Sequence, residues 1–280
     1  KAKAADGRHA RAPWKPEVVT PRHTLRIHPD EVSKQAKVQV LLKADRAARA
    51  YSDAISQVDV AVAEEFQRVF IANSEGMWLH DERPYIRLMI NAIATKDGEK
   101  QSGRETPGAM GGWEFIEEAD VEALAQSAAR GALTMCEAGY APSGKMPVVI
   151  ENGFGGVIFH EACGHLLETT SVAKGASIFC DRIGEQIAHP SVTAVDDGTM
   201  DGEWGSIAVD DEGLPAQRTV LIENGILKSY MVDRLGERKT GHARTGSGRR
   251  QSYRFAPTSR MRNTFIAGGT DKFEDMISSI

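Results

Sequence analysis

The sequence predicts an α+β protein: an antiparallel sheet packed with helices, then a helix-bearing catalytic segment and the start of a second β-rich domain. Two observations predict this class. Apolar and polar residues alternate across 55–98 and again across parts of 191–232, as they do in half-buried strands. Amphipathic helical spacing flanks the first of these blocks, over 30–50 and 120–139.

The composition narrows the class of protein. A chain of 280 residues, 41% hydrophobic and 26% charged, can bury a sizeable core. The net charge of -5 does not favour binding to nucleic acid, which is itself negatively charged. No apolar run approaches the roughly 18 residues of a membrane-spanning helix. The three cysteines cannot all pair, which favours a reducing compartment. We therefore expect a cytoplasmic protein with no nucleic-acid or membrane partner.

Three segments are expected along the chain. Residues 1–28 form a basic, proline-punctuated lead-in, 29–145 an amino-terminal α+β domain, and 146–280 a catalytic helix with a β-rich domain. The chain lacks an initiator Met. It ends on "DKFEDMISSI", which has the spacing of the start of an amphipathic helix but contains no residue that would end one. We expect a fragment that is truncated at the start of one domain and at the end of the other.

The elements of the first half follow from local patterns. We expect a helix over 30–50, with acidic residues in its first turn, and a helix over 120–139 that Gly139 ends. Between them we expect consecutive antiparallel strands and then a linker or mobile loop rich in glycine and serine. The expected strands are 55–66, 68–76 and 85–98, and the expected loop is 101–118.

The second half begins with "MPVVIENG", which we interpret as a short buried strand that leads through the turn Gly153–Gly156 into a helix. Two strand-then-acidic-turn units follow, over 191–200 and 205–215. Residues 218–232 predict a hairpin with Asn224-Gly225 at its tip, as type I′ turns prefer. Residues 242–257 predict a loop.

The stretch "GGVIFHEACGHLLE" carries the chemistry, because it reads H-E-x-x-x-H from His160 to His165. Histidines five apart on a regular helix diverge by about 140°. They can share one metal ion only if the helix widens locally into an i→i+5 turn, which Gly164 would tolerate. His160 and His165 would then bind Zn²⁺ and Glu161 would polarise a water. The alternative is an ordinary helix whose histidines are hydrogen-bonded or face solvent.

Two residues near this motif have open roles. Cys163 could substitute as a ligand, but a small buried packing residue is the favoured interpretation, as it is for Cys136 and Cys180. Glu168 could hydrogen-bond to a ligating histidine without binding the metal itself. The alternative is a solvated carboxylate at the helix end.

Two further groups have alternatives of their own. The acidic runs Asp196-Asp197 and Asp210-Asp211-Glu212 could bind Ca²⁺ or Mg²⁺, but each precedes a glycine, so turn chemistry is favoured. In "TGSGRR", Gly248 permits close approach and Arg249 and Arg250 can grip a peptide carboxylate or backbone. The alternative is a mobile surface loop.

The chain resembles the TldD branch of the TldD/PmbA family, the "modulator of DNA gyrase" metallopeptidases. The resemblance covers about 50–270 and rests on motifs in the family's order. These are "FHEACGHLLE", "VDDGTM", "GSIAVDDEGLPAQRTVLIENGILKSYMVDRLGERKTG", "TGSGRRQSY" and "RMRNTF". It implies a zinc peptidase acting on short or unfolded peptides, with His160 and His165 as zinc ligands and Glu161 as catalytic base. It also implies a PmbA/TldE-type partner that lacks the motif, with a homo-oligomer as the alternative.

The sequence departs from this family in one respect. The family's third zinc ligand is a cysteine in a carboxy-terminal glycine-rich motif, and nothing after "RMRNTF" resembles it. We therefore expect the third ligand to lie outside these 280 residues, which alone would be inactive. The competing hypothesis is a non-enzymatic regulatory or partner protein, such as a modulator of DNA gyrase.

Overall fold

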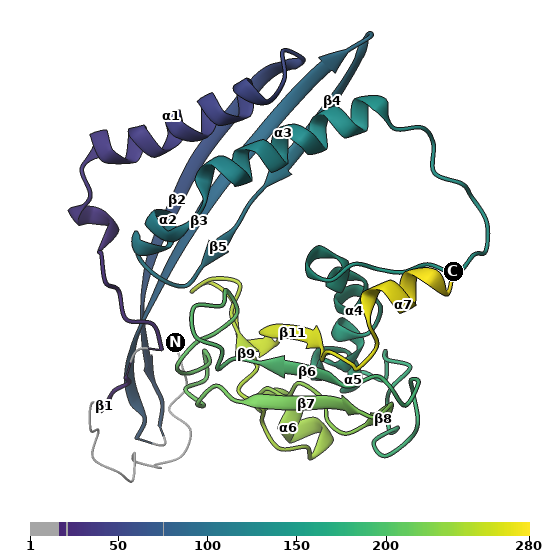
Figure 1. Cartoon of the computed structure of the whole chain (residues 1–280). Coiled ribbons are helices and arrows are strands. Elements are labelled where there is room, and N and C mark those ends of the chain that lie inside the picture. The colour runs from purple at the N-terminus through teal and green to yellow at the C-terminus, as the bar shows by residue number, and fades with distance from the viewer. Residues whose placement is uncertain (1–16, 21, 75) are drawn as a thin grey trace. The chain divides into compact units, whose positions relative to one another are not determined.

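A computed structural model describes residues 17–20, 22–74 and 76–280, so most of the predicted lead-in lies outside the described residues. The described chain forms two compact units. The first unit contains residues 23–67 and 83–145, and the second contains residues up to 22, 68–82 and 146–280. Helices and antiparallel sheets are mixed in the chain, so the predicted α+β class is confirmed (Figure 1). No described helix is both long and apolar enough to cross a membrane.

One five-stranded sheet is built on the central strand β3. It comprises β1 (Glu17–Val18), β2 (Ile55–Ala72), β3 (Trp78–Lys96), β4 (Glu99–Glu105) and β5 (Gly108–Ala109). Strand β3 pairs with all four others, parallel to β1 and antiparallel to β4 and β5. Every second residue of β3 from Ile86 to Ala94 is buried, as the period of a half-buried strand requires. The predicted turn before β4 has positive φ at Asp97 and Gly98.

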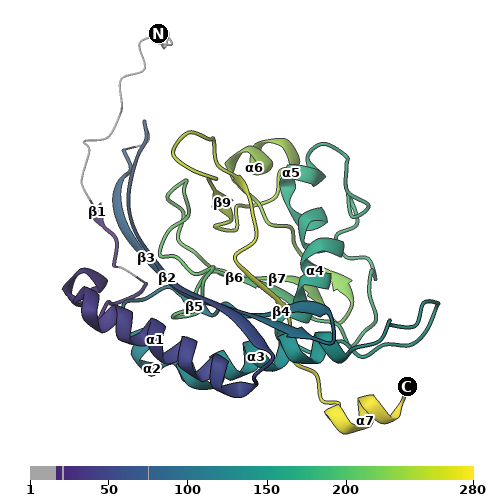
Figure 2. The same cartoon turned by 90° about the horizontal axis from the view of Figure 1, so that it is seen from above.

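Three helices accompany this sheet in the first unit: α1 (Lys34–Tyr51), α2 (Glu114–Glu118) and α3 (Val121–Glu137). Helices α1 and α3 lie side by side along the sheet (Figures 1 and 2). Both helices bury small residues in the core of this unit, with Ala44 and Ala48 buried on α1 and a row of alanines on α3. Small side chains at these positions allow the helices to pack closely in this core.

Two predicted boundaries in the first unit are wrong. The residues 55–66 and 68–76, which we expected to form two strands, belong mainly to the single continuous strand β2. Helix α1 begins at Lys34, where Ser33 accepts a hydrogen bond from the Ala36 backbone N. The acidic residues expected in its first turn lie in a separate 3-10 turn, η1 (Pro29–Glu31).

The predicted loop over 101–118 is also wrong, because β4, β5 and α2 occupy much of it. A Cβ on Gly103 would lie 2.0 Å from the Ala128 carbonyl oxygen and 2.4 Å from the Ala132 nitrogen. The glycine therefore marks a close approach of strand β4 to helix α3, not a flexible linker. Gly139 does not cap α3, because the helix ends at Glu137 and its C-cap is the extended residue Ala138.

The second unit contains a four-stranded antiparallel sheet of order β11-β6-β7-β8. Its strands are β6 (Ala194–Asp197), β7 (Arg218–Glu223), β8 (Ile226–Leu227) and β11 (Asn263–Ile266). The strands β9 (Gly248–Arg249) and β10 (Thr258–Ser259) form a separate antiparallel pair. The helical segments are η2 (Gly153–Gly156), α4 (Val157–Ala162), η3 (Gly164–Leu167), α5 (Thr169–Val172), α6 (Arg234–Thr240) and α7 (Phe273–Ser278). Phe159 of α4 and Leu167 of η3 are buried in the core beside this sheet, which fixes the motif segment in place.

Predictions for the second unit had mixed outcomes. The hairpin is confirmed, with φ of 49° at Asn224 and 80° at Gly225 between β7 and β8. The expected strand at 146–153 is wrong, because this segment has no strand pairing and exposes Val148 and Ile150. The strand predicted within 205–215 is reduced to an isolated bridge between Val209 and Pro215. The predicted loop 242–257 contains β9.

Candidate metal centre

The H-E-x-x-x-H motif spans a break between two helical segments. Helix α4 ends after Ala162, and Cys163 leaves the helical region with φ -126° and ψ -45°. The Cys163 N–H still donates to the Phe159 carbonyl at 2.9 Å, and the Cys163 carbonyl then accepts from Leu166 and Leu167. The structure therefore contains a helix end followed by the 3-10 turn η3, and not the widened i→i+5 turn that we took as the condition for a shared metal ion.

This break brings the two histidines together. The ring centroids of His160 and His165 lie 4.7 Å apart, with an interplanar angle of 87°. One potential ligand atom from each of His160, Glu161 and His165 lies within 4.8 Å of the others. No other group of three such side chains converges in the part of the chain that the structure describes.

Gly164 allows close packing at the break. It is buried, and a Cβ there would lie 2.4 Å from the sulfur of Met261, just before β11. The absence of a side chain lets η3 pack against Met261 and so sets the position of His165. We expected Gly164 to tolerate a distorted helix, but its observed contribution is this close contact.

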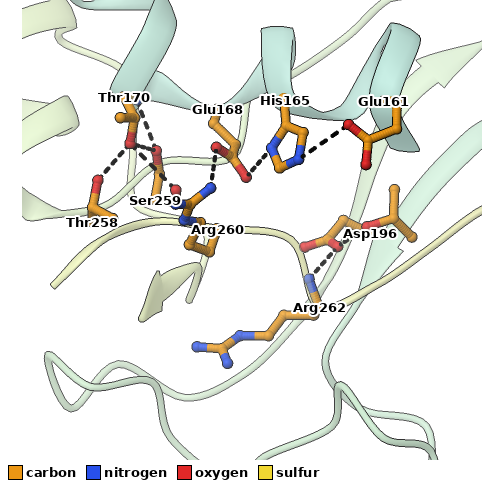
Figure 3. Close-up of polar contacts among 10 residues, drawn as sticks. Glu161, His165, Glu168, Thr170, Asp196, Thr258, Ser259, Arg260 and Arg262 are labelled. Carbon is orange, nitrogen blue, oxygen red and sulfur yellow. Dashed lines mark hydrogen bonds and ion pairs between the residues drawn. The ribbon is translucent and has the colours of Figure 1, made fainter. Parts of the chain in front are cut away.

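Glu168 contacts the ring of His165 at Nδ1 and so orients it. The Nδ1 of His165 lies 3.2 Å from Glu168 Oε1, and Arg260 lies 3.5 Å from Glu168 Oε2 (Figure 3). Burial raises the pKa of Glu168, and the neighbouring Arg260 and His165 oppose this rise by favouring its charged form. A carboxylate at Nδ1 fixes the imidazole tautomer and leaves Nε2 available as a ligand. That Nε2 lies 3.9 Å from Glu161 Oε2.

The environment of His160 favours the neutral ring that a metal requires. Burial lowers the pKa of His160, and repulsion from His165 lowers it further. Arg249 and Arg260 act in the same direction, whereas Glu161 opposes them. Glu161 keeps 67% of its side chain exposed, so its carboxylate is accessible to solvent. Two imidazoles beside a carboxylate form a donor set that suits Zn²⁺.

The cysteines lie outside this cluster. Burial raises the pKa of the Cys163 thiol, which disfavours the thiolate that binds metal, and Cys163 packs against the second core. Cys180 donates to the Val172 carbonyl, and Cys136 to the Ala94 carbonyl in the first unit. These contacts support the packing interpretation of all three.

The acidic runs form turns and anchor loops. Asp197 Oδ1 accepts from the Thr199 N–H at 2.8 Å, and Asp210 Oδ1 accepts from the Glu212 and Leu214 N–H groups at 2.9 Å. Neither run belongs to a ligand cluster among the described residues. Turn chemistry therefore accounts for both runs.

The predicted arginine loop lies in the same unit as the histidines. Arg249 and Arg250 line a cavity of about 430 Å³, whereas Gly248 is buried and its N–H donates to Asp210 Oδ2. The cavity also takes in Arg260, which the sequence analysis did not select. Arg260 and Glu168 are distant in the sequence, and no local spacing pattern predicts their contact.

Comparisons with known proteins match both halves of the chain to one family. Residues 27–135 match the PmbA/TldA metallopeptidase central domain, and residues 143–280 match its C-terminal domain. A Haemophilus influenzae protein named "Metalloprotease TldD homolog" is 39% identical over 256 residues, which are 90% of this chain and 53% of that protein. A Saccharolobus solfataricus protein named "Zinc metalloprotease TldD homolog" is 35% identical over 141 residues, 49% of this chain and 31% of that protein.

Two solved structures share the fold. A Thermotoga maritima protein described as a candidate modulator of a DNA gyrase aligns with a TM-score of 0.76 and 25% identity, covering 90% of this chain and 57% of that one. TldE from Thermococcus kodakarensis aligns with a TM-score of 0.71 and 21% identity, covering 95% and 60%. The chain thus spans about half the length of the curated relatives that cover most of it.

Proposed function

The chain belongs to the PmbA/TldD metallopeptidase family, and on that premise we propose that it is part of a zinc-dependent peptidase that hydrolyses short or unfolded peptides. The observation that carries the proposal is the convergence of His160, Glu161 and His165 to within 4.8 Å across the helix break. The name of the Saccharolobus relative supports zinc as the metal.

In this proposal the two histidines of the cluster bind the metal ion and its glutamate transfers the proton. His160 and His165 would hold the ion, which supplies Lewis acidity at the scissile carbonyl and lowers the pKa of a water. Glu161 is the catalytic base: it takes a proton from the attacking water and passes it to the leaving amine. Glu168 is a positioning residue that holds the His165 ring through Nδ1.

The intact enzyme needs parts that this chain does not show. The third zinc ligand comes from outside the described residues, none of whose cysteines joins the cluster. The enzyme acts in the cytoplasm with a PmbA/TldE-type partner or a second copy of itself. The shared fold of TldE is compatible with such a pairing of related chains.

The test is a Glu161→Gln variant of the full-length protein, purified with its partner. We expect peptide hydrolysis to fall at least about 100-fold, as for the loss of a general base, while the zinc content stays that of the wild type. Glu203→Gln is the control, because Glu203 is exposed in the same unit and should leave turnover unchanged. Full activity of Glu161→Gln would refute its role as base. Cleavage by the wild type that a chelator does not affect would refute the zinc mechanism, and the absence of any cleavage would favour a regulatory protein.

A further inference from the structure

The cavity beside the metal centre is built mainly from one short segment. Strands β9 and β10 and the turn between them supply its wall, and its volume is about 430 Å³. Basic, polar and apolar side chains all reach it: Arg249, Arg250, Gln251, Phe255, Ala256, Thr258 and Arg260. A pocket of this composition suits a small ligand with an anionic group and an apolar group.

The positive charge of the cavity is largely uncompensated. Arg249 has no carboxylate within ion-pair distance among the described residues, and the side chain of Arg250 donates to the Phe255 carbonyl at 2.5 Å and to no carboxylate of the described residues. Arg260 is the exception, because it lies 3.5 Å from the buried Glu168. Two guanidinium groups therefore line the cavity without acidic partners. Guanidinium groups bind carboxylates in bidentate, charge-assisted pairs.

The backbone that carries these arginines is fixed on both strands. On β9, the Gly248 and Arg250 N–H groups donate to Asp210 and Asp211 at 3.0 and 2.7 Å. On β10, the Thr170 hydroxyl lies 2.5 Å from the Thr258 hydroxyl and 2.9 Å from the Ser259 hydroxyl (Figure 3). The acidic run at 210–211 thus anchors a basic wall, which makes the cavity a preorganised feature and not a mobile loop.

The cavity is linked to the histidine cluster through Arg260 and Glu168. Arg260 lines the cavity and contacts Glu168, and Glu168 contacts the ligating candidate His165 (Figure 3). A peptide bound at the histidines can therefore place a neighbouring group in the cavity.

We propose that this cavity is a specificity subsite that binds a carboxylate of the peptide substrate through Arg249 and Arg250, with Phe255 and Ala256 contacting an adjacent apolar side chain. This inference rests on the proposed peptidase function for the identity of the ligand as a peptide. The carboxylate has two possible sources, the free carboxy terminus of the peptide or an Asp or Glu side chain close to the scissile bond.

Binding of labelled peptides to the full-length protein with its partner tests the subsite without requiring turnover. Four fluorescein-labelled hexapeptides ending in Phe form two matched pairs. One pair compares a free carboxy terminus with a carboxamide, and the other compares Glu with Gln at one internal position of the carboxamide peptide. We expect one acidic peptide to bind about 10- to 100-fold more tightly than its neutral match, and that pair identifies the source of the carboxylate.

The variants show whether the arginines cause the difference. Arg249→Gln and Arg250→Gln should each remove most of the preference and leave the affinity for the neutral peptide unchanged, and Arg249→Lys should restore part of it. Arg254→Gln is the matched control, because Arg254 lies on the same turn but outside the cavity lining and contacts Tyr253. Equal binding of acidic and neutral peptides by the wild type, or equal losses for both in the variants, would overturn the proposal.

Hydrolysis measured on the same peptides separates this proposal from the proposed function. A preference for carboxylate without any cleavage would support the subsite and refute the peptidase. Cleavage without a preference for carboxylate would do the reverse.

Discussion

The burial of Asp196 leads to a quantitative prediction about stability. Asp196 lies on β6, and its Oδ1 accepts from the Arg262 N–H at 2.7 Å (Figure 3). The same oxygen accepts from the Thr264 hydroxyl at 2.6 Å. Burial raises its pKa from 3.8 to about 6, in spite of these hydrogen bonds. The folded state therefore binds a proton that the unfolded state releases between about pH 4 and pH 6.

The sign and size of the effect follow from this difference. The contribution of Asp196 to stability is fully present below pH 3.8 and is lost as the pH rises through about 6. The shift corresponds to a loss of at most about 3 kcal/mol in the free energy of unfolding. Asp196→Asn removes the titration and keeps an oxygen acceptor for Arg262. The stability of the variant relative to the wild type should therefore rise by up to about 3 kcal/mol between pH 4 and pH 7.

Urea unfolding of both proteins at several pH values between 4 and 7.5 measures this quantity. The difference between the two free energies isolates Asp196 from the other titrating groups. Asp271→Asn, at an exposed site, is the control and should show no such trend. A difference that is constant with pH, or that falls as the pH rises, would refute the reasoning.

Two other predictions follow from the packing and from the support of the metal centre. Gly103→Val places side-chain atoms against the backbone of α3 and should lower the free energy of unfolding by about 3 kcal/mol, measured by urea unfolding, whereas Gly139→Val, at an open site, should change it by less than about 0.5 kcal/mol. An equal effect of the two substitutions would contradict the close approach of β4 to α3. Glu168→Gln weakens the hydrogen bond to His165 Nδ1 and should lower the zinc affinity of the full-length protein about 10- to 100-fold in a chelator competition assay. An unchanged affinity would show that Glu168 does not support the site.

Local patterns were sufficient for much of the fold. The Asn224-Gly225 tip was predictable because a type I′ turn requires positive φ at both positions. The second part of β3 was predictable because its alternation reflects one buried face, but the strand begins at Trp78, seven residues before the expected start. The segment 101–118 was not predictable, because Gly103 serves the close contact of β4 with α3 and is not part of a flexible linker. Likewise, "MPVVIENG" has the composition of a strand, but no described strand pairs with it.

At the candidate site too, local spacing predicted some features, and contacts between distant parts of the chain determined the others. The spacing of His160 and His165 identified the residues and showed that a regular helix would separate them. It could not show how the chain breaks at Cys163, because the contact of Gly164 with Met261 joins parts of the chain that are distant in the sequence. Arg260 was missed for the same reason, since its importance depends on its contact with Glu168.

The most direct test of the metal centre is the zinc content of the full-length protein, purified with its partner and without a chelator or histidine tag. We expect about one zinc ion per copy of this chain in the wild type, and little or none in His160→Asn and His165→Asn variants that remain folded. Wild-type zinc content in both variants would contradict the assignment of these histidines as ligands.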